Sequence, residues 1–174
     1  MIQVSKPAPE FSLQGVLKGQ IKKFRPLPGQ SKWTVIFFYP LDFTFVCPTE
    51  IKEFNRRLDE FAMLNARVFG ISTDSVYSHQ AWIKSDLGEL DFPLLSDITK
   101  EVSRQYGVLL EDKGVALRGT FVIDPRGILQ YQVVHDLNVG RSVTETLRVL
   151  KALQTGAMCP IEWSEKKKTL GKSK

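Results

Sequence analysis

The sequence predicts an α/β domain in which helices flank a central mixed β-sheet, with an extension at the N-terminus. Three observations support this prediction: two continuous apolar runs, the helical spacing of the apolar residues between them, and a Pro-x-Gly turn joining two later extended runs. The chain has 174 residues, of which 43% are hydrophobic and 25% charged. A chain of this size and composition can bury a core of its own as one compact domain.

The first elements form a strand–helix–strand unit. Residues 33–39 (WTVIFFY) are a continuous apolar run, which suits a strand buried on both faces of a sheet. Apolar residues then recur at helical spacing over residues 51–61, with charged residues between them, and predict an amphipathic helix. Residues 67–72 (RVFGIS) return as a strand, so the two strands should be parallel and joined by a helical crossover.

The later elements complete the pattern. Short helices are predicted over residues 78–84 and 100–106. Two extended runs, 117–123 and 128–135, are joined by Asp-Pro-Arg-Gly, whose proline and glycine fit a tight hairpin. Ser142 and Glu145 form a capping-box pattern before a last helix, which Gly156 can end. The predicted order is strand, helix, strand, helix, antiparallel hairpin and helix. This is the order of the thioredoxin-like fold, which we assign to residues 1–155.

Residues 156–174 are interpreted as a C-terminal tail. Its last thirteen residues hold five lysines and two glutamates, and therefore carry most of the formal charge of +5. With one aromatic residue and no second basic patch, a solvated end is a better interpretation than a nucleic-acid site. No apolar run approaches the roughly 20 residues needed to cross a membrane, and the start of the chain lacks a signal-peptide pattern. Because two cysteines do not make a disulfide framework, we expect a reducing, cytoplasmic setting.

Cys47 lies between the first predicted strand and helix, in YPLDFTFVCPTEI. Pro48 suits the first helical position, where its missing N–H costs nothing. Free backbone N–H groups and the positive end of the helix dipole should face the sulfur there and favour thiolate over thiol. Thiolate is the nucleophilic form of cysteine. The alternative role, a small buried residue, is common for free cysteine but does not explain the position at a helix start.

The residues around Cys47 resemble the peroxiredoxins. Pro40, Thr44 and Cys47 reproduce the proline, threonine and cysteine pattern of that family, and VCPTE continues it. The resemblance runs on through SHQAW, PLLSD, LRGTFVID and NVGRSVTETLR. It ends in MCP and Trp163, which are similar to the segment around the resolving cysteine of the typical two-cysteine subgroup, the alkyl hydroperoxide reductase C and thioredoxin peroxidase type. Essentially the whole chain is covered.

The resemblance implies a peroxidase in which a thiol reduces the O–O bond of a peroxide. Cys47 would be the nucleophile and would become a sulfenic acid as water or an alcohol leaves. The Thr44 hydroxyl would accept from the peroxide proton and steady the attacked oxygen. Pro40 would form a wall of the pocket and exclude water.

Three charged residues would support this chemistry. Arg118, in LRGTF, would stabilise the thiolate and the charge growing on the leaving oxygen. Without the resemblance it would be interpreted as an ordinary surface arginine of an edge strand. Glu50 and Arg141 would orient Arg118 through charge-assisted hydrogen bonds, although Glu50 alone would also suit a first-turn partner of the helix dipole.

Cys159 is the only other cysteine, and therefore the only thiol in the chain that can capture a sulfenic acid. It follows the last predicted helix in TGAMCPIEW, a segment expected to be mobile. The resemblance implies that two Cys47–Cys159 disulfides link a homodimer, while the sequence leaves an intrachain bond open. It also implies a decamer of five dimers, and thioredoxin or a flavoprotein disulfide reductase as the electron donor.

The remaining candidates are weaker. His79 and His135 show no metal-ligand spacing, so we expect no metal and no organic cofactor, and we interpret His79 as a surface or interface residue. The resemblance implies resistance to overoxidation, because residues 85–93 (SDLGELDFP) lack the Gly-Gly-Leu-Gly run of peroxide-sensitive members, and the tail lacks their Tyr-Phe pair. Two other functions stay open: a disulfide oxidoreductase, disfavoured because Cys47 has no C-x-x-C partner, and a ring-shaped binding or chaperone assembly.

Overall fold

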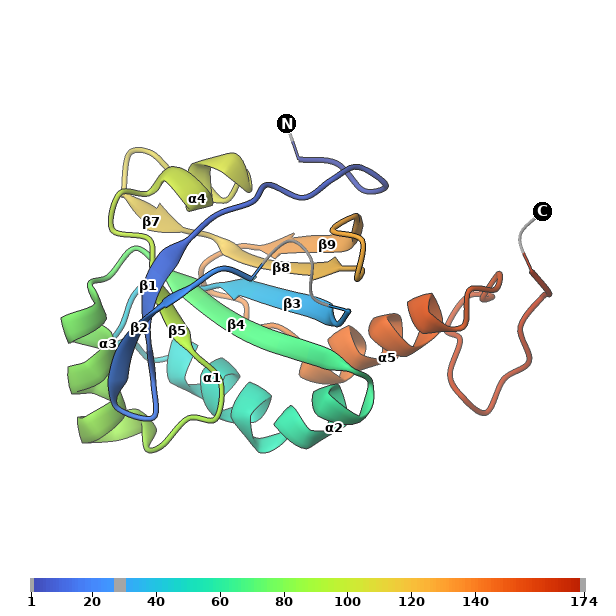
Figure 1. The fold of residues 1–174 in the computed structure, drawn as a ribbon, viewed down its shortest axis with the longest axis horizontal. Helices are drawn as coiled ribbons and strands as arrows, with labels where there is room; N and C mark the ends of the chain where they lie inside the picture. Colours follow the sequence, from blue (N-terminus) through green and yellow to red (C-terminus); the bar gives the residue numbers. More distant parts are fainter. Residues whose placement is uncertain (1, 27–30, 173–174) are drawn as a thin grey trace. The chain divides into compact units, whose positions relative to one another are not determined.

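A computed structural model describes residues 2–26 and 31–172 of the chain (Figure 1). It divides into two compact units, Met1–Arg141 and Ser142–Lys174, which are described separately. Three short stretches lie outside the described residues: residue 1 of the predicted extension, residues 27–30 of the predicted domain and residues 173–174 of the predicted tail. The predicted boundary at residue 155 stays a prediction. In the described part of the chain, no helix is long and apolar enough to cross a membrane.

The first unit is built on a mixed seven-stranded sheet of order β2-β1-β5-β4-β3-β8-β9. The central strands β3, β4 and β5 are parallel. Strands β1 and β8 pair antiparallel with β5 and β3, and the edge strands β2 and β9 pair antiparallel with β1 and β8. The mixed sheet and the hairpin at Asp-Pro-Arg-Gly are confirmed. The strands are β1 Leu13–Leu17, β2 Gln20–Phe24, β3 Trp33–Phe38, β4 Ala66–Ser72, β5 Leu94–Ser96, β8 Arg118–Ile123 and β9 Leu129–His135. A separate pair is formed by β6 Leu109–Leu110 and β7 Val115–Ala116.

Helices cover both faces of this sheet. Figure 1 shows α1 and α2 on one side and α4 on the other. The helix predicted over residues 51–61 begins earlier, at Cys47, and is divided at Arg57 into two helices. Pro48 is therefore the second helical residue and not the first. The helical elements of this unit are α1 Cys47–Arg56, α2 Leu58–Met63, α3 Val76–Trp82, the π-helical turn η1 Ile83–Leu87 and α4 Glu101–Gln105.

Strand β3 is buried on both faces, and its alternating side chains build both halves of the core. The Phe37 ring stacks on Phe54 of α1 with centroids 4.3 Å apart. Phe38 points to the opposite face and packs against Tyr106 and Phe121, at 5.3 and 5.7 Å. This double packing fixes the C-terminal end of β3, from which the chain continues through residues 39–46 to α1.

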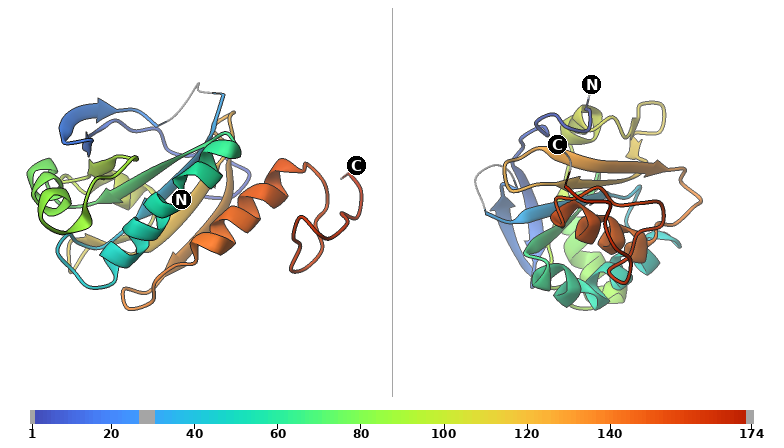
Figure 2. Two further views of the ribbon diagram at one scale, coloured as in Figure 1. Left: turned by 90° about the horizontal axis from the view of Figure 1, so that it is seen from below. Right: turned by 90° about the vertical axis from the view of Figure 1, so that its right-hand side faces the viewer.

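The second unit contains α5, Val143–Gln154, and the segment that follows it. The Ser142 hydroxyl accepts a hydrogen bond from the Glu145 N–H at 3.1 Å, which confirms the predicted N-terminal cap. The later residues fold back on themselves (Figure 2), and Met158 pairs with both Gly171 and Leu170 through its backbone, at 2.9 and 2.8 Å. The tail backbone thus closes a loop, while the described lysines at 166–168 and 172 are exposed, in agreement with the solvated end that the sequence predicted.

Candidate active site

Cys47 is the first residue of α1, and its side chain has no exposed surface. The backbone N–H groups of Thr49 and Glu50 are not directed at the sulfur, because both bind the Val46 carbonyl, at 3.1 and 3.4 Å. Pro48 has no N–H to offer. The hydrogen bond to the Cys47 sulfur comes instead from Arg118, whose Nη1 lies 3.4 Å away. The Arg118 guanidinium therefore supplies the N–H donor and the positive charge at the sulfur, which the sequence led us to expect from the start of the helix.

Arg118 is held in a buried ion-pair cluster. Its Nη1 also donates to Glu50 Oε2 at 2.6 Å, and its Nε donates to the Leu137 carbonyl at 2.7 Å. The side chains of Arg118 and Glu50 are only 4% and 3% exposed, so the interpretation of Arg118 as a surface arginine is wrong. Because the guanidinium is fixed at both ends, it holds one orientation toward the sulfur.

Arg141 completes the cluster. Its Nε and Nη2 donate to the two carboxylate oxygens of Glu50 at 2.8 Å each, and its backbone N–H adds a third bond at 2.9 Å. Its Nη1 donates to the carbonyls of Phe38 and Gly119, at 2.6 and 2.9 Å. The predicted role of Glu50 and Arg141 as partners of Arg118 thus has a direct geometric basis.

The charges of the cluster bear on the state of Cys47. Burial raises the pKa of Glu50, but the hydrogen bonds and charge of Arg141, with the charge of Arg118, outweigh burial and hold that pKa below its ordinary value. Two guanidiniums therefore face one carboxylate, which leaves a formal charge of +1 in a buried site. A thiolate on Cys47 neutralises this charge, whereas a thiol does not.

The loop before α1 carries the other two predicted residues. Thr44 is half-buried, and its hydroxyl donates to the Leu41 carbonyl at 2.9 Å, which leaves its oxygen lone pairs able to accept. Pro40 is buried. The structure thus joins Cys47, Arg118, Glu50 and Arg141 by direct contacts, and places Pro40 and Thr44 on the segment leading to them.

Cys159 belongs to the second unit. Its thiol is half-buried, 3.5 Å from the Thr155 hydroxyl and 3.7 Å from the carbonyls of Ala152 and Ala157. The thiol therefore lies at the C-terminal end of α5, among groups that accept its hydrogen. Both cysteines are free.

Sequence reasoning missed a buried polar network beside the loop. His79 has no exposed surface, and its Nδ1 lies 2.8 Å from Asp42 Oδ2, so its interpretation as a surface or interface residue is wrong. Val76, His79 and Trp82 are buried at a spacing of three along α3, a pattern that could have placed His79 on the inner face of this helix. The charged partner, 37 residues away, has no such local signal.

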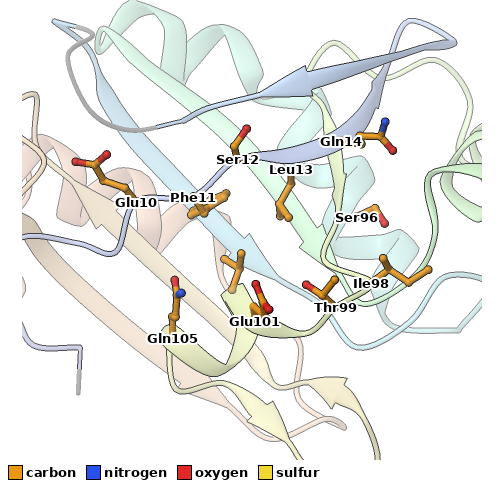
Figure 3. A pocket seen from close by; sticks show the side chains of 11 residues that line it. Glu10, Phe11, Ser12, Leu13, Gln14, Ser96, Ile98, Thr99, Glu101 and Gln105 are labelled. Carbon is orange, nitrogen blue, oxygen red and sulfur yellow. The ribbon is translucent and has the colours of Figure 1, made fainter.

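One concavity of the first unit lies away from these residues. An open pocket of about 440 Å³ lies between the N-terminal segment and α4 (Figure 3). It is lined by side chains that include Glu10, Phe11, Ile98 and Glu101, with neither a cysteine nor an arginine among them. In the described residues, no group of three or more His, Cys, Asp or Glu side chains is arranged to hold a metal ion.

Comparison with known proteins agrees with this geometry. The model of the AhpC/TSA family matches residues 4–132. The candidate peroxiredoxin of the rubredoxin operon in Clostridium pasteurianum is 55% identical, over 93% of this chain and 95% of its own. The mitochondrial thioredoxin-dependent peroxide reductase of Drosophila melanogaster is 46% identical, over 94% and 74% of the two chains.

A solved structure extends the likeness to the fold. The reduced 2-Cys peroxiredoxin of Plasmodium vivax superimposes with a TM-score of 0.93 at 39% identity, over 97% of this chain and 93% of that one. The sequence matches span nearly the whole chain, and the superposition confirms the thioredoxin-like architecture. The chain therefore belongs to the AhpC/TSA family, and it is a peroxiredoxin, a thiol-dependent peroxidase.

Proposed function

We propose that the protein reduces hydrogen peroxide and organic hydroperoxides through a sulfenic acid on Cys47, and that Cys159 of the partner subunit then closes a disulfide. The observation that carries this proposal is the buried Arg118–Glu50–Arg141 cluster, whose excess positive charge a Cys47 thiolate neutralises. The alternative disulfide oxidoreductase would need a second cysteine at position 50, which is occupied by Glu50 and bonded to both arginines.

In the first step, the thiolate electron pair forms an S–O bond to the terminal peroxide oxygen while the O–O bond breaks. Sulfur is oxidised by two electrons, and the departing oxygen takes a proton to leave as water or an alcohol. Arg118 stabilises the charge on that oxygen because its guanidinium is already held at the sulfur. The Thr44 oxygen accepts from the peroxide O–H, and Pro40 shields the reacting atoms from water.

In the second step, the thiol of Cys159 attacks the sulfenic acid, which forms the disulfide and releases water. Cys47 is fully buried at the start of α1, so this first turn has to unwind before the sulfur can be reached. The turn is weakly capped, because Val46 offers no side-chain hydrogen bond. Local unwinding of the residues before Glu50, which the two arginines hold, should therefore cost little free energy.

The proposal includes the electron donor and the assembly. Thioredoxin or a flavoprotein disulfide reductase would reduce the disulfide, in a homodimer that assembles further as five dimers. A reducing, cytoplasmic setting is supported by the small number of cysteines. Support for a thioredoxin donor comes from the Drosophila relative, whose name states this dependence.

The test combines stopped-flow kinetics with non-reducing gels. Hydrogen peroxide should oxidise the wild type rapidly and shift it to a disulfide-linked dimer band. Cys47→Ser should remove both responses while leaving the circular dichroism spectrum unchanged. Cys159→Ser should still be oxidised once but should form no dimer band. Near-normal turnover by Cys47→Ser would refute the mechanism, and an oxidised band at monomer mass would point to an intrachain disulfide.

A further inference from the structure

We propose that His79 is a positioning residue for peroxide reduction, acting through Asp42 to hold the loop that carries Pro40 and Thr44. This inference rests on the proposed role of that loop in the peroxide step. His79 lies on α3, and Asp42 lies between the two loop residues in sequence. The two side chains are 0% and 1% exposed, so their interaction is shielded from solvent and salt.

The network is closed by two further groups. The Tyr39 hydroxyl donates to Asp42 Oδ1 at 2.9 Å, while His79 Nδ1 lies 2.8 Å from Asp42 Oδ2. On the other side of the ring, His79 Nε2 lies 3.2 Å from the Leu95 carbonyl. Burial and the neighbouring Asp42 raise the pKa of Tyr39 well above its ordinary value, so the phenol stays protonated and remains a donor.

These partners determine how many protons the pair holds. The Leu95 carbonyl can only accept, so His79 Nε2 has to carry a hydrogen. The contact between Nδ1 and Asp42 Oδ2 is favourable only if one proton lies in it, on either atom. Asp42 and His79 together are then electrically neutral, with every donor and acceptor matched. Removing any member would leave a buried polar group unpaired, which costs much more than one ordinary hydrogen bond is worth.

Asp42 is also held through its backbone. Its N–H donates to Asp74 Oδ2 at 3.0 Å, and the same carboxylate oxygen accepts from the Ser72 hydroxyl at 2.6 Å. Ser72 ends β4, so the loop is tied to the central sheet at this residue. Main chain and side chain of Asp42 are therefore fixed independently, one by β4 and the other by α3 and the end of β3.

Asp42 is two residues from Pro40 and two from Thr44, so a shift of Asp42 moves both. The Thr44 hydroxyl is in turn oriented by the Leu41 carbonyl, next to Asp42. A misplacement of about 1 Å in a substrate-positioning group can slow a reaction by on the order of a hundredfold. The hydrogen bond to the sulfur comes from Arg118 on β8, which is not a member of this network. Loosening it should therefore impair peroxide reduction without changing the reactivity of the thiolate itself.

The first experiment compares two matched removals of a buried hydroxyl. Tyr39→Phe leaves Asp42 Oδ1 without its donor, whereas Tyr106→Phe removes an equally buried hydroxyl that binds the Pro9 carbonyl at 3.0 Å, away from the loop. We expect Tyr39→Phe to slow oxidation of Cys47 by hydrogen peroxide about tenfold or more, and Tyr106→Phe to leave that rate unchanged. Alkylation of Cys47 by iodoacetamide, which needs the thiolate but not Thr44, should be similar in both variants.

The second experiment uses conservative rescue. Asp42→Asn keeps every contact if His79 is a neutral imidazole, because the amide donates to Nδ1 while Nε2 still donates to Leu95. Asp42→Asn should thus react with peroxide nearly as the wild type does, and Asp42→Ala should be slow. His79→Gln should likewise keep more peroxide reactivity than His79→Leu, because its amide can still donate to Asp42.

The outcomes separate this inference from the proposed function. An unreactive wild type would overturn the proposed function itself. A reactive wild type with Tyr39→Phe and Asp42→Ala equally reactive would overturn only the positioning role. Parallel losses of peroxide and iodoacetamide reactivity, with lower melting temperatures, would also overturn it, because they would show a general structural role. Loss of peroxide reactivity alone, restored by Asp42→Asn, is the expected result.

Discussion

Replacing Glu50 by glutamine should damage both stability and catalysis, because one carboxylate holds two buried guanidiniums. Glu50 Oε2 accepts from Arg118 and Arg141, at 2.6 and 2.8 Å, and Oε1 accepts from the backbone and side chain of Arg141. A glutamine amide can replace only one of these oxygens. Its NH₂ group would meet two N–H donors at the other position, so two charged hydrogen bonds are lost.

The expected magnitude follows from these contacts. Hydrogen bonds to charged groups are worth about 1.5–3 kcal/mol each, so two lost bonds cost roughly 3–6 kcal/mol. Breaking a buried ion pair by removing one partner typically costs about 3–5 kcal/mol, which agrees. For a domain of this size about 2–4 °C of melting temperature corresponds to 1 kcal/mol, so we expect a decrease of roughly 6–24 °C. A misdirected Arg118 should also slow the peroxide step by about a hundredfold or more.

Thermal unfolding by circular dichroism and stopped-flow oxidation by hydrogen peroxide measure the two effects. The matched control is Glu53→Gln on the same helix, where the carboxylate pairs with Arg56 at 2.7 Å on the surface. This control should keep the melting temperature and the rate of the wild type, because exposed ion pairs contribute little. A Glu50→Gln variant that melts and reacts like Glu53→Gln would show that the cluster does not depend on its carboxylate.

Further predictions concern Arg118, acid, assembly and overoxidation. Arg118→Ala should slow Cys47 oxidation by about a hundredfold to a thousandfold in stopped flow, and a rate near wild type would contradict its role at the leaving oxygen. The pKa of Glu50 is lowered in the folded state, so its contribution to stability is present above the ordinary value of 4.5 and is lost as the pH falls through the lowered pKa. The difference in denaturant stability between wild type and Glu50→Gln should therefore shrink on acidification, and a constant difference would refute this linkage. Light scattering of the reduced protein should give the mass of a decamer, and a monomer would contradict the proposed assembly. After turnover with excess hydrogen peroxide, mass spectrometry should find the Cys47–Cys159 disulfide and little two-oxygen adduct on Cys47, whereas rapid accumulation of that adduct at low-millimolar peroxide would contradict the expected resistance.

The fold was predictable where a local pattern determines the element. The apolar run of β3 and the Asp-Pro-Arg-Gly turn predicted a buried strand and a hairpin, and both are present. The hairpin of β1 and β2 was not predicted beyond an N-terminal extension, although it joins the central sheet through β5. Strand β2 (QIKKF) is mostly exposed and has no clean alternation, so its strand state depends on pairing with β1.

The site was predictable to a different degree at each residue. The position of Cys47 at a helix start follows from the apolar run and the proline after it. Its contact with Arg118 joins residues 71 apart, and that of Glu50 with Arg141 joins residues 91 apart, so both required the resemblance. The burial of His79 was missed because the hydrogen bond that makes a buried polar side chain tolerable is a tertiary contact.

The long separation between Cys47 and its charged partners has a consequence for synthesis. During translation at about 5–20 residues per second, the 94 residues from Pro48 to Arg141 take roughly 5–20 s to follow the cysteine out of the ribosomal catalytic centre. Until then the nascent chain lacks the arginine that holds Glu50, and Cys47 is an ordinary thiol of low reactivity. The enzyme should therefore acquire its sensitivity to peroxide only after Arg141 has been synthesised, so a ribosome-bound chain stalled before Arg141 should react with peroxide as slowly as a free cysteine does.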